Sequence, residues 1–269
     1  MAVTRPCGAG GRNWSADRQR RTAAFGRCCI ITKRITAFAG HYGSGKTHLA
    51  LNYALHLRAE QDAVTAAARD TAAPRVCLVD LDIVNPYYRT HDARVFLEER
   101  GVLLVSSVFA GSNMELPAMP PDAVRIFDDK SLAAVLDVGG DDRGALALGR
   151  YAPRLADTDE ADMLLVINAA RPLTGSADDV LEILGEIEAA SHVRFTGVVN
   201  NTNLGRDTTA DTVLRSHAFA GEVCEKAALP LRFTAVREDL AEAVAAGGVG
   251  AVFPLRLFAK DSWNVYTGL

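Results

Sequence analysis

The stretch FAGHYGSGKTHLALNYAL, residues 38 to 55, places glycines, a lysine and a threonine between an apolar segment and a segment with helical periodicity. Its residues 40 to 47 satisfy the pattern GxxxxGK[ST]. Glycines let the backbone curl so that successive N–H groups point at phosphate oxygens, and the positive end of the following helix attracts the same anion. The pattern predicts a phosphate-binding loop (a Walker A motif), with nucleotide contacts from Gly40, Gly43, Ser44, Gly45, Lys46, Thr47 and His48.

Two side chains of this loop have expected chemical roles. We expect Lys46 to reach the β- and γ-phosphates and to act in catalysis, and the Thr47 hydroxyl to bind Mg²⁺. A plain glycine-rich turn with a solvated lysine is the structural alternative. The apolar residues before the loop and the helical periodicity after it favour the phosphate site, because the pattern requires that context.

Carboxylates follow two further apolar segments. VDLDIVNPYYR puts Asp80 and Asp82 at the end of one predicted strand, and VLDVGGDDRG puts Asp137, Gly139 and Gly140 at the end of another. Beside bound phosphates, a strand-end carboxylate can hold a water of Mg²⁺, and a glycine pair lets a backbone N–H approach the γ-phosphate. We expect Asp80 and Asp137 at the metal. Asp80 and Asp82 face the same side of the strand, so either could lie nearer the γ-phosphate. Either of the first two aspartates alone also fits a solvated strand end or a helix cap.

These motifs lie in an alternation of strand-like and helix-like segments. Short apolar runs predict strands, and apolar residues at every third or fourth position predict helices. Their order predicts an α/β fold, a mainly parallel sheet with helices on both faces, in one domain over residues 34–269. Predicted strands cover residues 34–39, 75–82, 102–107, 132–138, 162–169, 195–201 and 230–236, and predicted helices cover 46–60, 87–100, 143–155, 176–190, 209–228 and 238–246.

The two ends of the chain differ from this body in composition. The first 34 residues carry seven arginines and Lys33 against Asp17 alone, although the whole chain has a net charge of −4. Residues 1–33 therefore fit a disordered basic arm or a misassigned start, with a nucleic-acid arm or a transit-like segment as alternatives. At the other end, Pro254 interrupts GAVFPLRLFAKDSW, which favours a final strand and tail over a membrane-targeting helix.

Composition narrows the class of protein. The acidic body disfavours nucleic acid as a partner, and no apolar run reaches the roughly 18 residues that span a bilayer. Five cysteines without CxxC spacing argue against a disulfide framework and a zinc site, and fit a reducing cytoplasm.

The motifs and their order resemble the SIMIBI class of P-loop ATPases, which includes MinD, ParA, the nitrogenase iron protein and the cobyrinate diamide and dethiobiotin synthetases. The resemblance covers roughly residues 34–246. It implies ATP and Mg²⁺ as cofactors, Asp82 as the residue that orients the attacking water, and Asp137 with Gly139 and Gly140 as the second switch. VVNNTN lies where the family places an adenine-contacting asparagine, so Asn200 and Asn201 are candidates. GHYGSGKT together with VDLDIVNPYYR resembles a group of prokaryotic ATP-binding proteins.

One loop residue departs from the MinD and ParA pattern. That subgroup has a signature lysine directly after the first glycine of the loop, where this chain has His41. Tyr87, Tyr88 and Arg89 fit either a switch surface or simple packing. An arginine in NAARPLT, residues 168 to 174, fits either a contact with nucleotide or partner, or a cap of the next helix.

The resemblance implies an ATPase switch that regulates a protein partner, with a nucleotide-linked homodimer as one arrangement. An ATP-dependent ligase or amidotransferase-like synthetase acting on a carboxylate metabolite is the alternative. A metal or metal-cluster carrier is disfavoured because the chain has no CxxC pair.

Overall fold

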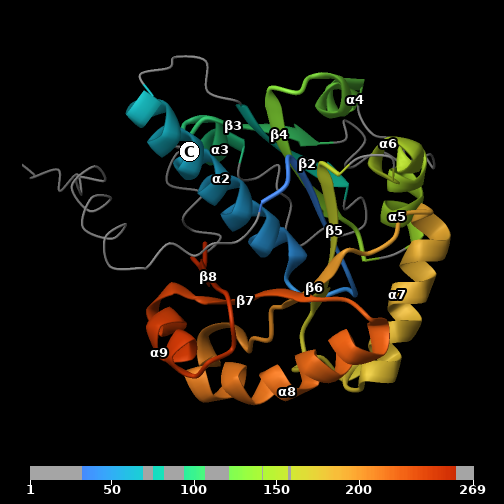
Figure 1. Ribbon diagram of the computed structural model, residues 1–269, viewed down its shortest axis with the longest axis vertical. Helices are drawn as coiled ribbons and strands as arrows, with labels where there is room; N and C mark the ends of the chain where they lie inside the picture. Colours follow the sequence, from blue (N-terminus) through green and yellow to red (C-terminus); the bar gives the residue numbers. More distant parts are fainter. Residues whose placement is uncertain are drawn as a thin grey trace, which may run out of the picture.

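The computed structural model describes residues 32–68, 75–81, 94–106, 121–140, 142–156 and 159–258. Eight parallel strands form one sheet in the order β3-β2-β4-β1-β5-β6-β7-β8 (Figure 1). The fold is α/β with a parallel sheet, as predicted. The strands are β1 (Ile35–Ala39), β2 (Arg75–Leu81), β3 (Val102–Ser106), β4 (Leu132–Val138), β5 (Ala161–Ile167), β6 (Gly197–Asn200), β7 (Leu231–Arg237) and β8 (Val252–Leu255).

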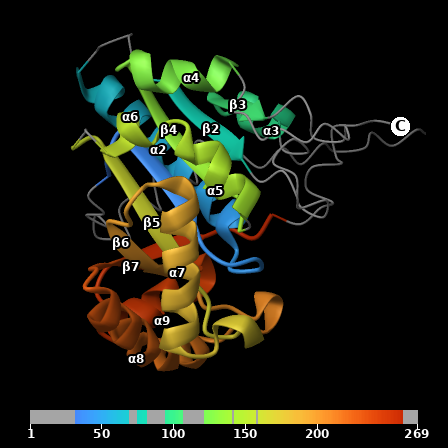
Figure 2. The ribbon, with the colours of Figure 1, turned by 90° about the vertical axis from the view of Figure 1, so that its right-hand side faces the viewer.

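The helices divide between the two faces of the sheet. The chain moves from β1 to β2 and β3 in one direction, then returns through β4 and continues to β8 in the other. Since parallel crossovers are right-handed, the first two helices must cover one face and the later ones the other. In Figure 2, α5 and α7 lie nearer the viewer than the strands, and α2 lies behind them. The helices are α2 (Lys46–Ala68), α3 (Arg94–Glu98), α4 (Pro121–Asp128), α5 (Asp142–Gly149), α6 (Ala152–Ala156), α7 (Ala177–Ser191), α8 (Ala210–Ala227) and α9 (Ala241–Ala246).

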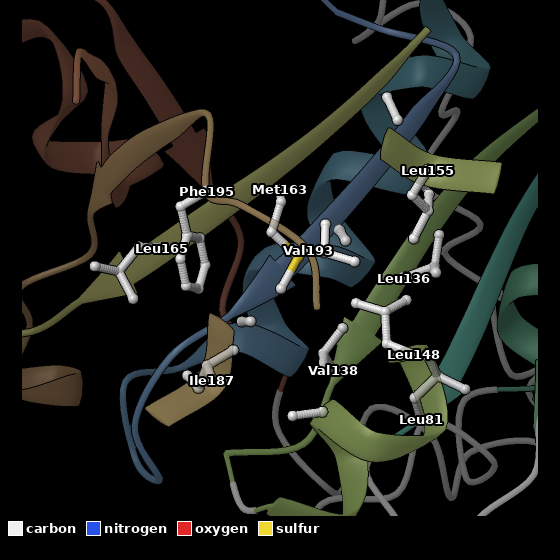
Figure 3. Packing of buried hydrophobic residues seen from close by; sticks show 14 of the residues in the cluster. Leu81, Leu136, Val138, Leu148, Leu155, Met163, Leu165, Ile187, Val193 and Phe195 are labelled. Carbon is white, nitrogen blue, oxygen red and sulfur yellow. The ribbon is translucent and has the colours of Figure 1, made fainter. Parts of the chain in front are cut away.

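Two large apolar clusters follow from the alternation of side chains along the strands. Leu136 and Val138 of β4 and Met163 and Leu165 of β5 pack against α5, α6 and α7 (Figure 3). The alternate strand positions pack against α2 and α3 on the opposite face, where Tyr53 is fully enclosed. Because helices cover both faces of the sheet, a ligand is expected at the edge formed by the carboxyl ends of the strands.

The helix α2 runs to Ala68, eight residues beyond its predicted end, and the observed elements differ from the predicted ones at two further places. The predicted helix 143–155 is two helices, α5 and α6, because Pro153 cannot donate a hydrogen bond to residue 149 and a helix cannot continue through it. The short helix α4 was not predicted. It begins with Pro121, a residue whose fixed φ suits the first helical position.

The amino-terminal boundary of the body lies close to the predicted one. Lys33 already contacts the sheet, with its Nζ 3.3 Å from the Ala161 carbonyl oxygen, and Arg34 binds Glu160 at 2.9 Å. Residues 1–31 lie outside the described residues, so the disordered arm stays a prediction. Among the described helices, none is both long and apolar enough to cross a bilayer.

Candidate functional site

The predicted phosphate loop connects the end of β1 to the start of α2. Three of its glycines have positive φ angles, 148° at Gly40, 79° at Gly43 and 87° at Gly45, and residues with side chains rarely adopt these values. A Cβ on Gly40 would also lie 2.4 Å from the carbonyl oxygen of Val166 on β5. The glycines are therefore required both by the curl of the loop and by its close contact with the neighbouring strand.

Three side chains hold carbonyl oxygens of this loop. Arg171 Nε donates to Gly43 at 2.9 Å, and Asn201 Nδ2 donates to Ser44 at 2.7 Å. Lys46 Nζ folds back over the loop and donates to the carbonyl oxygens of Gly40 at 2.9 Å and His41 at 3.1 Å. These contacts occupy carbonyl oxygens that would otherwise repel an anion.

Two predicted carboxylates meet beside the loop. Asp80 of β2 and Asp137 of β4 are register partners, and Asp137 is also the partner of Phe38 on β1. Neighbouring strands lie about 4.8 Å apart, so the two aspartates are adjacent at the edge where the loop begins. Their positions alternate with residues of the α5 face, such as Leu136 and Val138, which places both on the α2 face. The register thus places Asp80 and Asp137 side by side near the start of α2, and the roles predicted for them stay predictions.

The glycine pair after β4 lies directly against the phosphate loop. A Cβ on Gly140 would be 2.7 Å from the backbone nitrogen of Tyr42 and 2.8 Å from the carbonyl oxygen of Gly40. Gly139 is buried and packs against Gly144 at the start of α5. The predicted second switch therefore touches the loop through backbone atoms, an arrangement that only glycine permits.

We expect Gly140→Ala to weaken binding of Mg-ATP by tenfold or more, about 1.4 kcal/mol, because the new methyl group must displace the backbone of the loop. Isothermal titration of the folded variant measures this loss. Gly185→Ala is the matched control, since a Cβ at Gly185 of α7 meets no atom within 4 Å. The control should bind like wild type and gain up to about 1 kcal/mol of stability. Equal affinities of the two variants would show that the contact with Tyr42 does not matter.

The two asparagines at the end of β6 are placed differently from each other. Asn200 is fully buried, donates to Ser216 Oγ at 2.9 Å and accepts from the backbone and hydroxyl of Thr202. Asn201 is 2% exposed and points at the phosphate loop. The position of Asn200 suits support of the turn after β6, whereas Asn201 lies close enough to the loop to meet a nucleotide. The predicted contact with adenine stays a prediction.

Other predicted residues are placed beside the loop or lie outside the described range. Thr47 and His48 form the first turn of α2 and are half-buried. Burial lowers the pKa of the His48 imidazole, and a hydrogen bond with the backbone of Phe258 opposes this shift. His41 Nδ1 lies 2.9 Å from the carbonyl oxygen of Tyr42. Asp82 and the segment with Tyr87, Tyr88 and Arg89 lie outside the described residues.

The residues at this edge fit a Mg²⁺-bound nucleotide. Magnesium prefers octahedral oxygen ligands and is usually held by one or two carboxylates together with phosphates and water. Thr47, Asp80 and Asp137 supply a hydroxyl and two carboxylates. Within the described ranges there is no cluster of three or more His, Cys, Asp or Glu side chains of the kind that holds a metal by protein groups alone. In the same part of the chain, the hydroxyl of Ser44 is buried and has no hydrogen-bond partner.

An open hollow of about 410 Å³ lies at the carboxyl ends of β7 and β8, on the same edge of the sheet as the loop. Asn52 of α2 exchanges two hydrogen bonds with the backbone of Arg256, at 2.9 and 3.1 Å, and His48 contacts Phe258. The hollow therefore adjoins the first two turns of α2. The hollow was not predicted from the sequence. The signal that could have found it is the end of two strands on the same edge of the sheet as the loop, where α/β folds bind ligands. Its lining is Phe96, Arg237, Glu238, Asp239, Leu255, Arg256, Leu257 and Phe258.

No protein-family model and no curated protein matches the chain. Among solved structures, it is similar to chloroplast FtsY from Physcomitrella patens, with a TM-score of 0.49, 17% identity, and coverage of 85% of this chain and 63% of that one. FtsY from Elizabethkingia anophelis gives a TM-score of 0.43, 17% identity, and coverage of 87% and 64%. FlhF complexed with GTP and Mg²⁺ gives 0.41, 14%, and coverage of 75% and 65%.

The chain thus spans slightly less than two thirds of the length of each of these proteins. All three likenesses have TM-scores below 0.5. At identities below 20%, this likeness concerns the fold. The function of the chain therefore has to be argued from its own residues.

Proposed function

We propose that this chain binds Mg-ATP and hydrolyses it as a switch that regulates a protein partner in the cytoplasm. The observation that carries the proposal is the placement of Asp80 and Asp137 side by side at the start of α2, where the glycine loop ends. A glycine loop alone binds an anion, but a loop beside two carboxylates also suits the cation that accompanies a triphosphate.

Each group has a role in this proposal. Backbone N–H groups of the loop and the positive end of α2 bind the phosphates, and Lys46 exchanges its carbonyl partners for phosphate oxygens. Thr47, Asp80 and Asp137 would hold Mg²⁺, which when bound neutralises charge on the phosphates. Asp82, or Asp80 in its place, orients the attacking water. The protein acts mainly by positioning these groups and by stabilising charge.

The hollow beside α2 is the place we propose for the nucleoside. Its apolar part, including Phe96 and Phe258, suits the flat face of a base, and its charged rim suits the polar edge and the ribose. The rim consists of two ion pairs, Arg237 with Asp239 and Arg256 with Glu238.

We expect wild type to bind ATP at least tenfold more tightly than GTP, measured as Kd by titration in the presence of Mg²⁺. Phe258→Ala should weaken ATP binding by about tenfold, in line with the 1 to 3 kcal/mol of a stacked base, while tripolyphosphate binds as before. Asn201→Ala distinguishes two roles. It removes the preference for ATP if Asn201 reads the base, and it weakens ATP and GTP equally if Asn201 only holds the loop. Equal wild-type affinities for ATP and GTP would contradict the assignment of adenine.

The switch is tested by ATP turnover of purified protein with no added metabolite. We expect slow basal turnover that accelerates when the protein partner is added. Strict dependence of turnover on a small carboxylate would instead identify the chain as a ligase or amidotransferase-like synthetase. Pull-downs with wild type and Lys46→Ala, each with and without ATP, identify the partner.

A further inference from the structure

Arg171 holds the phosphate loop from outside. It follows β5 at the start of the 3₁₀ turn Pro172–Thr174, 128 residues away from the loop glycine that it contacts. Its Nε donates to the Gly43 carbonyl oxygen at 2.9 Å. A Cβ on Gly43 would be 3.4 Å from Nε and 3.7 Å from both Cδ and Cζ. Arg171 is exposed to solvent, and its contact with the loop consists of this hydrogen bond and of the three side-chain atoms that lie near Gly43.

The turn that carries Arg171 is itself fixed. The backbone N–H of Arg171 donates to the Asn168 carbonyl at 3.1 Å, and Thr174 Oγ1 donates to the same carbonyl at 3.0 Å. Asn168 is fully buried, and its Oδ1 accepts from the backbone of Ala170 and Asn203. The backbone of Arg171 is therefore anchored to the ends of both β5 and β6, which fixes the point from which its side chain extends to the loop.

Holding the carbonyl oxygens fixes where the amides point. In a trans peptide, the carbonyl and the following N–H point in opposite directions. Arg171 and Asn201 hold the oxygens of Gly43 and Ser44 outside the loop, so the N–H groups of Ser44 and Gly45 face its interior. The Ser44 N–H indeed donates to the His41 carbonyl across the loop at 3.2 Å. On the proposed function, a phosphate would bind on that interior side and would replace the His41 carbonyl oxygen as the acceptor of the Ser44 N–H.

We propose that Arg171 is a positioning residue of the nucleotide site: its Nε keeps the peptide between Gly43 and Ser44 in the orientation that binds phosphate. This inference rests on the proposed binding of nucleotide. The hydrogen bond that Nε donates holds this peptide, and the charge of the guanidinium contributes less. Because the loop is already ordered before the nucleotide binds, binding loses less conformational entropy. The effect of Arg171 is therefore expected in nucleotide affinity more than in turnover.

Two substitutions separate the donor from the charge. In Arg171→Gln, the side-chain nitrogen occupies the same place along the side chain as the arginine Nε, so a donor remains and the charge is lost. In Arg171→Met, the new side chain is about as long as that of glutamine and has no hydrogen-bond donor. We expect Arg171→Met to raise the Kd of Mg-ATP by about 5- to 10-fold, the effect of losing one ordinary hydrogen bond. Arg171→Gln should stay within about threefold of wild type, and kcat at saturation should change less than Kd in both variants.

Arg194→Met is the matched control, because Arg194 is 89% exposed and pairs with Glu188 on α7. Amide hydrogen exchange of residues 41–47 in the nucleotide-free proteins supplies a second measurement. It should be faster in Arg171→Met than in wild type, Arg171→Gln and the control.

The outcomes distinguish this inference from the proposed function. If wild type binds ATP and Arg171→Met binds it equally well, the inference is wrong and the proposed function stands. If Arg171→Gln binds as poorly as Arg171→Met, the charge matters and the role assigned to Nε is overturned. If wild type binds no nucleotide, the proposed function fails, and unchanged exchange of residues 41–47 would then refute the support of the loop by Arg171.

Discussion

Lys46→Ala is expected to abolish most of the thermal stabilisation that Mg-ATP should give to this protein under the proposed function. A ligand at a hundredfold excess over its Kd stabilises the folded state by about 2.7 kcal/mol. The Lys46 ammonium lies within 3.1 Å of the Gly40 and His41 carbonyl oxygens, where the loop is expected to receive phosphates, so its loss removes a positive charge from the site. The measurement is the melting temperature of wild type and variant with and without Mg-ATP.

Lys130→Ala is the control for this experiment. Lys130 is 63% exposed and pairs with Glu160 just before β5, at the opposite edge of the sheet from the loop. It should keep the full shift in melting temperature. The nucleotide-free Lys46→Ala protein is compared as well, because the variant also loses two hydrogen bonds within the loop. A wild-type melting temperature that does not respond to Mg-ATP would refute nucleotide binding itself.

The second large effect concerns hydrolysis. Asp82→Asn keeps the size of the side chain and removes its charge, so it should bind Mg-ATP with nearly wild-type affinity. Turnover should fall by about tenfold to a thousandfold, or 1.4 to 4 kcal/mol in the barrier, because the attacking water loses its orienting group. Single-turnover rates and nucleotide affinities of the variant measure the two effects separately.

Asp80→Asn and Thr47→Ala complete this comparison. Asp80 is the register partner of Asp137, so its variant should mainly change the dependence on Mg²⁺ concentration. Thr47→Ala should weaken Mg²⁺-dependent binding in the same way. If Asp80→Asn instead loses turnover while Asp82→Asn does not, Asp80 is the residue that orients water. If neither loses turnover while ATP still binds, the assignment of this switch is wrong, and the synthetase becomes the better explanation.

The sequence by itself determined the features that depend on neighbouring residues. The loop glycines, Lys46 and Thr47 lie within eight consecutive positions, and their spacing alone predicts the phosphate loop. Apolar runs ending in Asp80 and Asp137 predicted both strands and the edge at which they end, because parallel strands with helical connections all end on one side. Gly149 and Pro153 are sequence signals for a helix break. The apolar periodicity continues on both sides of them, so a single helix was predicted.

Only the tertiary structure decided which distant residues meet. Strand order made Asp80 and Asp137 register partners, although 57 positions separate them and the sequence does not specify which strands pair. Arg171 and Asn201 reach the loop across 128 and 157 residues, and both side chains fitted several roles until their contacts were known. Gly140 is required because an added Cβ would lie 2.7 Å from the backbone nitrogen of Tyr42 in the loop. Local propensity cannot predict such contacts, since they arise from the packing of β1 between β4 and β5.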